Sequence, residues 1–277
     1  MTKTNVFALI VFLLVSIEYA AAQFPAEDLQ ESDPRIFRLG AGLAYSFTGY
    51  RDETGSPINR YLNTLTYSLN FNIERENLFH NIDINFFLGQ PRMFAPHIGY
   101  PHRQYISARA NINYALAFPL WGNDIFPGSL GGAFRTTVHF SGSNDFRLLS
   151  SPTGVVLFSL DLHIRQKWII NERNTLIFSA GFPVIGYAVR PPFAGLDERW
   201  MRYLDEGSFL RLLTLGRITS FHNYHAIFGN LNHHYEVSTL FSFYLGLGFE
   251  LSRFNFPRNK PRTDAIFRLN SGITFTF

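Results

Sequence analysis

The chain has 277 residues, with 24 Lys and Arg against 21 Asp and Glu, which gives a formal net charge of +3. This weak positive balance points to no particular class of partner, and we expect no nucleic-acid binding. The sequence contains no Cys, so we expect no disulfide, no thiolate metal site and no lipid anchor on Cys. No other pattern indicates a metal or cofactor, and none is expected.

The first 22 residues are typical of a secretory signal peptide. Lys3 precedes an apolar run from Val6 to Ile17, and the small residues Ala20, Ala21 and Ala22 follow it. This run is shorter than the roughly 20 residues of a spanning helix. The polar, Pro-flanked segment 23–34 is then predicted to be a periplasmic lead-in, and residues 35–277 a single domain.

From Phe37 onward, apolar residues alternate with small or polar ones, which is the period of a β-strand with one apolar face. The alternation predicts ten strands, of which the eighth is the least regular. They cover about 36–49, 61–74, 78–89, 104–118, 131–141, 153–169, 175–187, 214–227, 234–252 and 264–277. Most connections alternate between short and long, as in transmembrane up-and-down antiparallel barrels. The irregular region leaves eight or twelve strands possible, and a soluble β-sandwich is the other all-β alternative.

The strand pattern also predicts two particular connections and a set of aromatic residues at strand ends. Phe228-Gly-Asn-Leu231 is predicted to be a tight turn, and 119–130 a longer connection on the side of the short turns. Five aromatic residues at strand ends are candidates for the belts that line membrane interfaces. These are Tyr61, Phe118, Trp121, Trp168 and Phe254.

The C-terminal sequence Ile273-Thr-Phe275-Thr-Phe277 resembles the closing strand of Gram-negative outer-membrane β-barrel proteins. In that family, a final strand with a C-terminal Phe is read by the barrel-assembly machinery. The resemblance therefore implies a location in the bacterial outer membrane, contact with outer-membrane lipid, and the assembly machinery as a partner during biogenesis.

If the apolar faces meet lipid, the alternation directs charged side chains of both signs to the interior. An isolated buried charge costs about several kcal/mol, so these groups must be paired or hydrated. A ten-stranded barrel is only slightly wider than the eight-stranded barrels that side chains fill. We therefore expect a cross-linked interior, with a narrow channel as the alternative. The predicted interior residues are Arg38, Glu74, Asp83, Arg109, Arg135, Asp161, His163, Arg165, Glu250 and Arg268.

His139 and Ser141 lie two residues apart, and therefore on one face of the fifth predicted strand. This spacing resembles outer-membrane phospholipase A and lipid A 3-O-deacylase, which implies Ser141 as nucleophile and His139 as base in ester hydrolysis. Both families usually place Asn directly after the Ser, whereas this chain has Gly142. Strand parity also turns both residues into the lumen, away from acyl chains.

Other histidines lie in His222-x-x-His225 and His233-His234. Residues three apart or adjacent on a strand face opposite sides, so neither pair can bind one metal ion by itself.

The long segment 188–213 contains apolar residues at helical spacing between Leu196 and Leu204. A short amphipathic helix there could plug the barrel or dock another envelope protein through Trp200, Met201 and Leu204. The leading prediction is a non-enzymatic barrel that serves as subunit or accessory of an envelope complex for secretion, assembly or uptake. Ester hydrolysis of phospholipid or lipid A through Ser141 and His139 is the first alternative, and a narrow channel is the second.

Overall fold

A computed structural model describes most of the predicted barrel domain. The described residues are 36–53, 56–75, 78–90, 92–93, 105–143, 153–190, 198–256 and 260–277. The chain divides into two compact units, and all described residues belong to the second, Arg35–Phe277. The predicted signal peptide and lead-in segment therefore lie outside the described residues.

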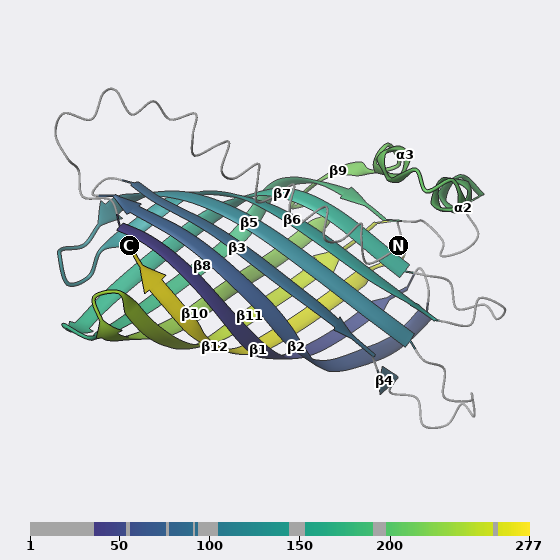
Figure 1. Ribbon diagram of the computed structural model, residues 1–277. Helices are drawn as coiled ribbons and strands as arrows, with labels where there is room; N and C mark the ends of the chain where they lie inside the picture. Colours follow the sequence, from purple (N-terminus) through teal and green to yellow (C-terminus); the bar gives the residue numbers. More distant parts are fainter. Residues whose placement is uncertain are drawn as a thin grey trace. The chain divides into compact units, whose positions relative to one another are not determined.

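Ten long antiparallel strands close into a barrel, because β1 pairs with β12 as well as with β2 (Figure 1). The prediction of an all-β barrel with ten strands is confirmed. The strands are β1 (Ile36–Asp52), β2 (Ser56–Arg75), β3 (Leu78–Gly89), β5 (Tyr105–Trp121), β6 (Gly128–Ser143), β7 (Thr153–Asn171), β8 (Asn174–Val189), β10 (Tyr224–Ser238), β11 (Phe241–Phe254) and β12 (Arg262–Thr276). Two short strands extend this sheet, namely β4 (Arg92–Met93) along β2 and β9 (Arg217–Ser220) along β8.

The alternation in the sequence separates an apolar outer face from a buried inner face. On β1, Leu43, Tyr45 and Phe47 are 43–50% exposed, whereas the interleaved Ala44, Ser46 and Thr48 are at most 3% exposed. A band of half-exposed apolar side chains would be costly in water and is favourable against lipid acyl chains. The same side-chain period therefore accounts for both the lipid-facing surface and the polar interior.

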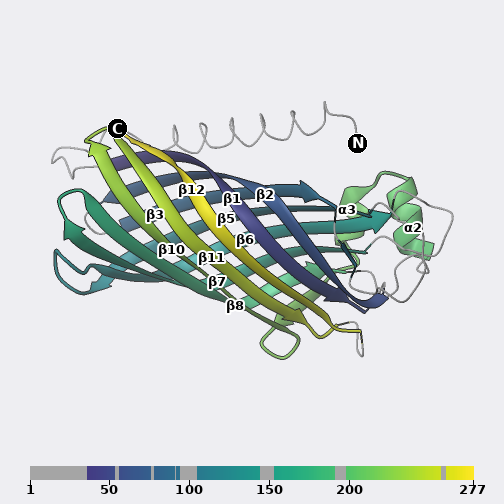
Figure 2. The same ribbon diagram turned by 90° about the horizontal axis from the view of Figure 1, so that it is seen from below.

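The two ends of the barrel differ in the connections they carry (Figure 2). At the terminal end, where Arg38 of β1 lies opposite Thr276 of β12, short turns join successive strands. One of them is stabilised by Asn171, whose side-chain oxygen accepts the backbone N–H groups of Arg173 and Asn174 at 3.0 and 2.9 Å. We call the opposite end, where most connections are longer, the loop end.

The predicted bounds 119–130 of the longer connection are too wide, because β5 continues to Trp121 and β6 begins at Gly128. The connection between them is residues 122–127, which is shorter than predicted but still longer than the other connections at this end. Gly122 has φ +102°, and a Cβ there would lie 1.8 Å from the Phe126 carbonyl oxygen, so this turn requires Gly. Asn123 closes the turn by accepting the N–H groups of Ile125 and Phe126.

The predicted turn at Phe228–Leu231 is wrong, because these residues lie within β10, and the turn to β11 follows Ser238. A Cβ on Gly229 would lie 2.8 Å from the Phe249 ring and 3.1 Å from the Ser179 carbonyl oxygen. Gly229 therefore allows close packing within the strand and does not mark a turn. The predicted strand 214–227 is replaced by β9 and the first residues of β10, separated by a turn at 221–223.

The helical spacing after Leu196 corresponds to α2 (Glu198–Asp205), which α3 (Phe209–Leu213) follows (Figure 1). The side chains of Trp200, Met201 and Leu204 lie outside the described residues. Leu212 of α3 is buried against Val189 at the end of β8, and the Tyr187 hydroxyl donates to the Leu213 carbonyl oxygen at 2.6 Å. These contacts fix α3 to the loop end of β8. Among the described helices, none has the length and apolar character needed to cross a bilayer.

Candidate functional site: a polar network that crosses the lumen

The order of strands around the barrel determines which side chains face each other across the lumen. β5 and β11 are separated by β3, β2, β1 and β12 on one side and by β6, β7, β8 and β10 on the other, so they lie diametrically opposite. Arg109 of β5 and Glu250 of β11 form an ion pair. Both side chains are nearly inaccessible to solvent, at 2% and 6%. This ion pair therefore spans the full width of the lumen.

Glu250 is the centre of a larger ion cluster. Its carboxylate also lies 3.7 Å from Nη1 of Arg135 and 3.5 Å from Nη2 of Arg268. Arg135 in turn pairs with Asp161 through Nε at 3.0 Å, and its guanidinium lies over the Phe228 ring at 4.2 Å. Since a buried charge is tolerated only when it is paired and hydrogen-bonded, the cluster stabilises its members jointly. We call Arg109, Arg135, Asp161, Glu250 and Arg268 the central cluster.

Glu74 organises a second level of contacts near the terminal end. It pairs with Arg38 on the adjacent strand β1, and with Arg165 and Lys167 of β7 at 3.3 and 3.8 Å. The Arg165 guanidinium also lies over the Phe79 ring at 4.0 Å. β2 and β7 are not adjacent, so these ion pairs cross the lumen as well.

A cavity of about 130 Å³ lies at this level. Its polar lining includes Arg38, Asp83, His163 and His234. The amide of Asn81 donates to Asp83. The cavity is a small polar pocket on the terminal side of the central cluster.

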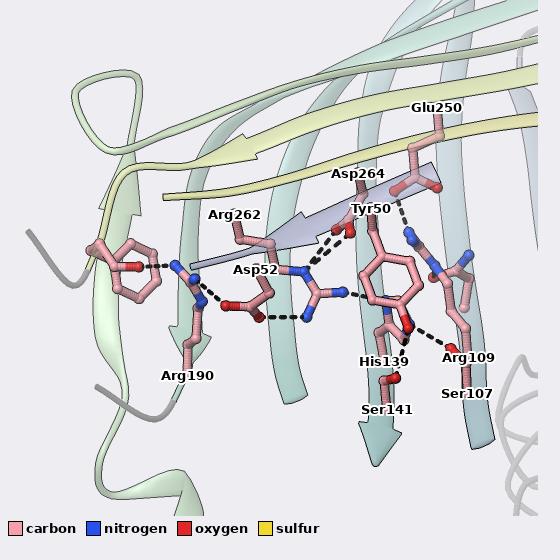
Figure 3. Close-up of polar contacts among 12 residues, drawn as sticks. Tyr50, Asp52, Ser107, Arg109, His139, Ser141, Arg190, Glu250, Arg262 and Asp264 are labelled. Carbon is pink, nitrogen blue, oxygen red and sulfur yellow. Dashed lines mark hydrogen bonds and ion pairs between the residues drawn. The ribbon is translucent and has the colours of Figure 1, made fainter. Parts of the chain in front are cut away.

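A third level, near the loop end, consists of two Arg and two Asp (Figure 3). Asp52 of β1 accepts from Arg190 at 2.6 Å and from Arg262 at 3.3 Å. Arg262 also binds Asp264 at 3.1 Å, and Arg190 donates to the Phe256 carbonyl oxygen. We call Asp52, Arg190, Arg262 and Asp264 the loop-end cluster. All four side chains are at most 3% exposed, and their charges balance.

His139 and Ser141 lie beside the loop-end cluster, inside the lumen, and each is 1% exposed. The Arg262 guanidinium donates to Nδ1 of His139 from the opposite wall, and Nε2 of His139 lies 3.0 Å from Ser107 Oγ. The Ser141 hydroxyl is bonded to the Tyr50 hydroxyl at 2.7 Å (Figure 3).

These contacts determine the tautomer of His139. A guanidinium can only donate, so Nδ1 accepts, and the neutral ring then carries its proton on Nε2. That N–H donates to Ser107. A general base needs the reverse arrangement, with a free lone pair towards the nucleophile and an acidic partner on the other nitrogen. The arrangement is suited to holding β5, β6 and β12 together and does not prepare Ser141 for attack on an ester.

The structure places the other sequence-predicted residues as follows. The charged and histidine residues predicted to face the interior are buried or partly buried, and they contribute to the ion pairs and the cavity described above. They are Arg38, Glu74, Asp83, Arg109, Arg135, Asp161, His163, Arg165, Glu250 and Arg268. The sequence did not indicate the ion pairs of Asp52, Arg190 and Arg262, which lie beyond the predicted strand ends. Two of them could have been found from the sequence. On β1 and β12 the even-numbered residues face the lumen, and this alternation continues as far as Asp52 and Arg262.

The remaining predicted residues lie at the edges of the barrel. Among the candidates for the aromatic belts, Tyr61, Phe118 and Trp121 are exposed, but Phe254 is 2% exposed and packs on Tyr224 inside the lumen. Its prediction as a belt residue is therefore wrong, because its parity on β11 is inward. Phe275 and Phe277 are exposed at the terminal end, and Phe277 donates its N–H to the Phe37 carbonyl oxygen at 2.8 Å. In the part of the chain that the structure describes, no cluster of His, Asp or Glu could hold a metal ion.

The sequence matches no protein-family model and no curated protein. The fold is similar to that of the outer membrane protease OmpT from Escherichia coli, with a TM-score of 0.52 and 9% identity over 91% of this chain and 100% of that chain. It is also matched to Neisserial surface protein A, with a TM-score of 0.36 and 9% identity over 87% of this chain and 97% of that chain. Identities this low concern the fold alone. The chain is a closed ten-stranded β-barrel of the kind found in Gram-negative outer-membrane proteins.

Proposed function

We propose that the protein is a non-enzymatic barrel of the bacterial outer membrane that serves as a subunit or accessory of an envelope complex for secretion, assembly or uptake. In this proposal its lumen is sealed, and the loop end carries its interactions with other envelope proteins. The observation that carries the proposal is the Arg109–Glu250 ion pair across the lumen. Solute passage at this level would require that ion pair to open.

The cost of such an opening supports a sealed lumen. Separating a buried ion pair so that one charge is left uncompensated costs about 3–5 kcal/mol. The Glu74 contacts and the loop-end cluster add further ion pairs on the two sides of the central cluster. A continuous diffusion pathway would have to disrupt contacts at all three levels, which disfavours the narrow-channel alternative.

The surroundings of His139 and Ser141 disfavour the ester-hydrolase alternative. Both side chains are buried within the lumen, whereas the acyl ester of a membrane lipid lies outside the barrel. The Arg262 guanidinium occupies the position at which a catalytic His would need an acidic partner. These residues are better explained as structural members of the loop-end interior.

The α2–α3 segment is the part of the chain that we propose for partner docking. α3 is fixed to β8 through Leu212 and Tyr187, so it holds α2 at the loop end. The exposed Glu198 and Arg202 belong to α2. In this proposal Trp200, Met201 and Leu204 contact the partner, and Ile273, Phe275 and Phe277 form the signal for the barrel-assembly machinery.

The experiment is purification of the tagged protein from its native membrane in mild detergent, followed by mass spectrometry of stoichiometric co-eluting proteins. A variant with Trp200→Ala, Met201→Ala and Leu204→Ala tests the docking residues, with Arg173→Gln in the terminal-end turn as the control. We expect a defined partner that the triple variant loses and the control retains. A heat-modifiable barrel that elutes without any stoichiometric partner would contradict the proposal.

A further inference from the structure

A broad depression lies on the outer face of the barrel. It is a groove of about 610 Å³ across five neighbouring strands, β10, β11, β12, β1 and β2. These strands lie side by side in Figure 1. The groove therefore faces the surroundings of the barrel and is separate from the lumen.

The strand register arranges the residues of the groove in rows that run across the strands. The row nearest the loop end is polar and cationic. In it, Arg51 lies opposite Thr263, Thr263 opposite Arg253, and Arg253 opposite His225. All four residues are exposed, whereas neighbours such as Tyr50 and Asp264 are buried in the lumen. The four side chains therefore project from the outer face.

The next row towards the middle of the barrel is apolar, and its central residues have small side chains, which we call the floor of the groove. Gly49 and Ala265 lie opposite each other at its centre, and Tyr61, Leu251 and Ile227 form its walls. A Cβ on Gly49 would meet only the Tyr61 ring, at 3.5 Å, so the floor is open. The small floor residues leave an apolar depression between these walls.

The row beyond this floor consists of aromatic residues. Phe47 and Phe249 each lie opposite Phe267. Phe47 and Phe267 are about half exposed, so the apolar belt of the barrel begins there. Positive charge therefore meets the apolar belt at the edge of the groove, at the depth where lipid headgroups meet acyl chains.

The two arginines are positioned to act on one anion. Their strands flank β12, so their Cα atoms are about 10 Å apart at two strand spacings, a distance that two Arg side chains can bridge. Glu53 pairs with Arg51 at 2.9 Å and offsets its charge, and the neutral Asn255 side chain accepts from Nε of Arg253 at 2.9 Å, so these four residues carry a net charge of +1. These contacts restrict both guanidinium groups. Planar guanidinium groups suit the multiple oxygens of a phosphate.

We propose that this groove binds a phosphate-bearing lipid of the outer leaflet, with its phosphate between Arg51 and Arg253 and one acyl chain over Gly49 and Ala265. The occupant follows from charge complementarity and from the order of the rows, since a lipid presents its phosphate and its hydrocarbon in the same order. The inference stands independently of the proposed function, because it concerns the outer face alone.

The test uses the folded full-length protein in detergent, titrated with lipid and followed by native mass spectrometry. The ligands are lipid A with two phosphates, the same lipid without phosphate, phosphatidylglycerol, and inorganic phosphate as competitor. We expect tighter binding of the phosphorylated lipids than of the phosphate-free lipid, with no displacement by inorganic phosphate at equal concentration. Equal binding of both forms of lipid A would overturn the proposal.

Two variants separate the phosphate site from the acyl site. Arg51→Gln with Arg253→Gln is expected to weaken binding on the order of thirtyfold, since each of the two Arg near an anionic lipid surface contributes on the order of 1 kcal/mol. Arg173→Gln, an exposed Arg at the terminal end, is the matched control and should bind as wild type. Gly49→Val fills the floor and should weaken lipid binding while preserving the heat-modifiable fold. Unchanged binding in both groove variants would refute the inference.

Discussion

Replacement of Glu250 by Gln tests the central cluster most sharply. The change keeps the shape of the side chain and removes its charge, so that Arg109, Arg135 and Arg268 lose the carboxylate they share. Of the cluster's two carboxylates, only Asp161 would remain to balance three guanidinium groups. We expect the free energy of unfolding to fall by about 3–5 kcal/mol, the range for breaking a buried ion pair. This corresponds to a shift of about 10²- to 4 × 10³-fold in the unfolding equilibrium, since every 1.4 kcal/mol is tenfold.

The assay is urea unfolding of the barrel in lipid vesicles, followed by Trp fluorescence and by heat-modifiable mobility. Glu172→Gln, which removes an exposed carboxylate in the terminal-end turn, is the control and should change stability by no more than about 0.5 kcal/mol. The double variant Arg109→Gln/Glu250→Gln completes a cycle, in which we expect a coupling energy of about 1–3 kcal/mol. If Glu250→Gln is as stable as Glu172→Gln, and the coupling is near zero, the cross-lumen pair does not stabilise the barrel.

Further predictions concern individual contacts. Ser141→Ala removes the hydrogen bond to Tyr50 and should cost about 1 kcal/mol of stability. Fatty-acid release from outer-membrane lipid should be at the background level in both the wild type and this variant. Hydrolysis by the wild type that Ser141→Ala abolishes would instead support the ester-hydrolase alternative. Gly229→Ala should cost about 1–3 kcal/mol through its clash with Phe249. Gly132→Ala, whose Cβ would meet its nearest atom at 3.9 Å, should be close to neutral in the same urea titration.

Strand alternation predicts this fold well because lipid outside and a crowded polar interior impose opposite requirements on successive residues. Leu43 and Tyr45 face outward while Ala44 and Ser46 face inward, as a period of two requires. The same parity indicates an inward direction for Arg109 and Glu250. It cannot reveal that these two residues meet, because their contact depends on strand order and on the relative height of β5 and β11.

Two failures of the sequence interpretation have clear physical causes. The Gly229-Asn230 pair has the composition of a turn, but the Gly lies within a strand, where the Phe249 ring and the Ser179 carbonyl oxygen approach its backbone closely. The loop-end cluster was missed because Asp52 and Arg262 were assigned to loops. The alternation of apolar residues that was used to assign strands stops before these two charged residues. The strands themselves continue further, to Asp52 in β1 and from Arg262 in β12.

The most direct test of the sealed lumen is ion current through planar bilayers that contain the purified wild-type protein. Flotation with vesicles and heat-modifiable mobility establish beforehand that the barrel is folded and inserted. Because the Glu74 contacts, the central cluster and the loop-end cluster all cross the lumen, we expect no discrete conductance steps. Reproducible steps from inserted, folded protein would contradict the account and favour a narrow channel.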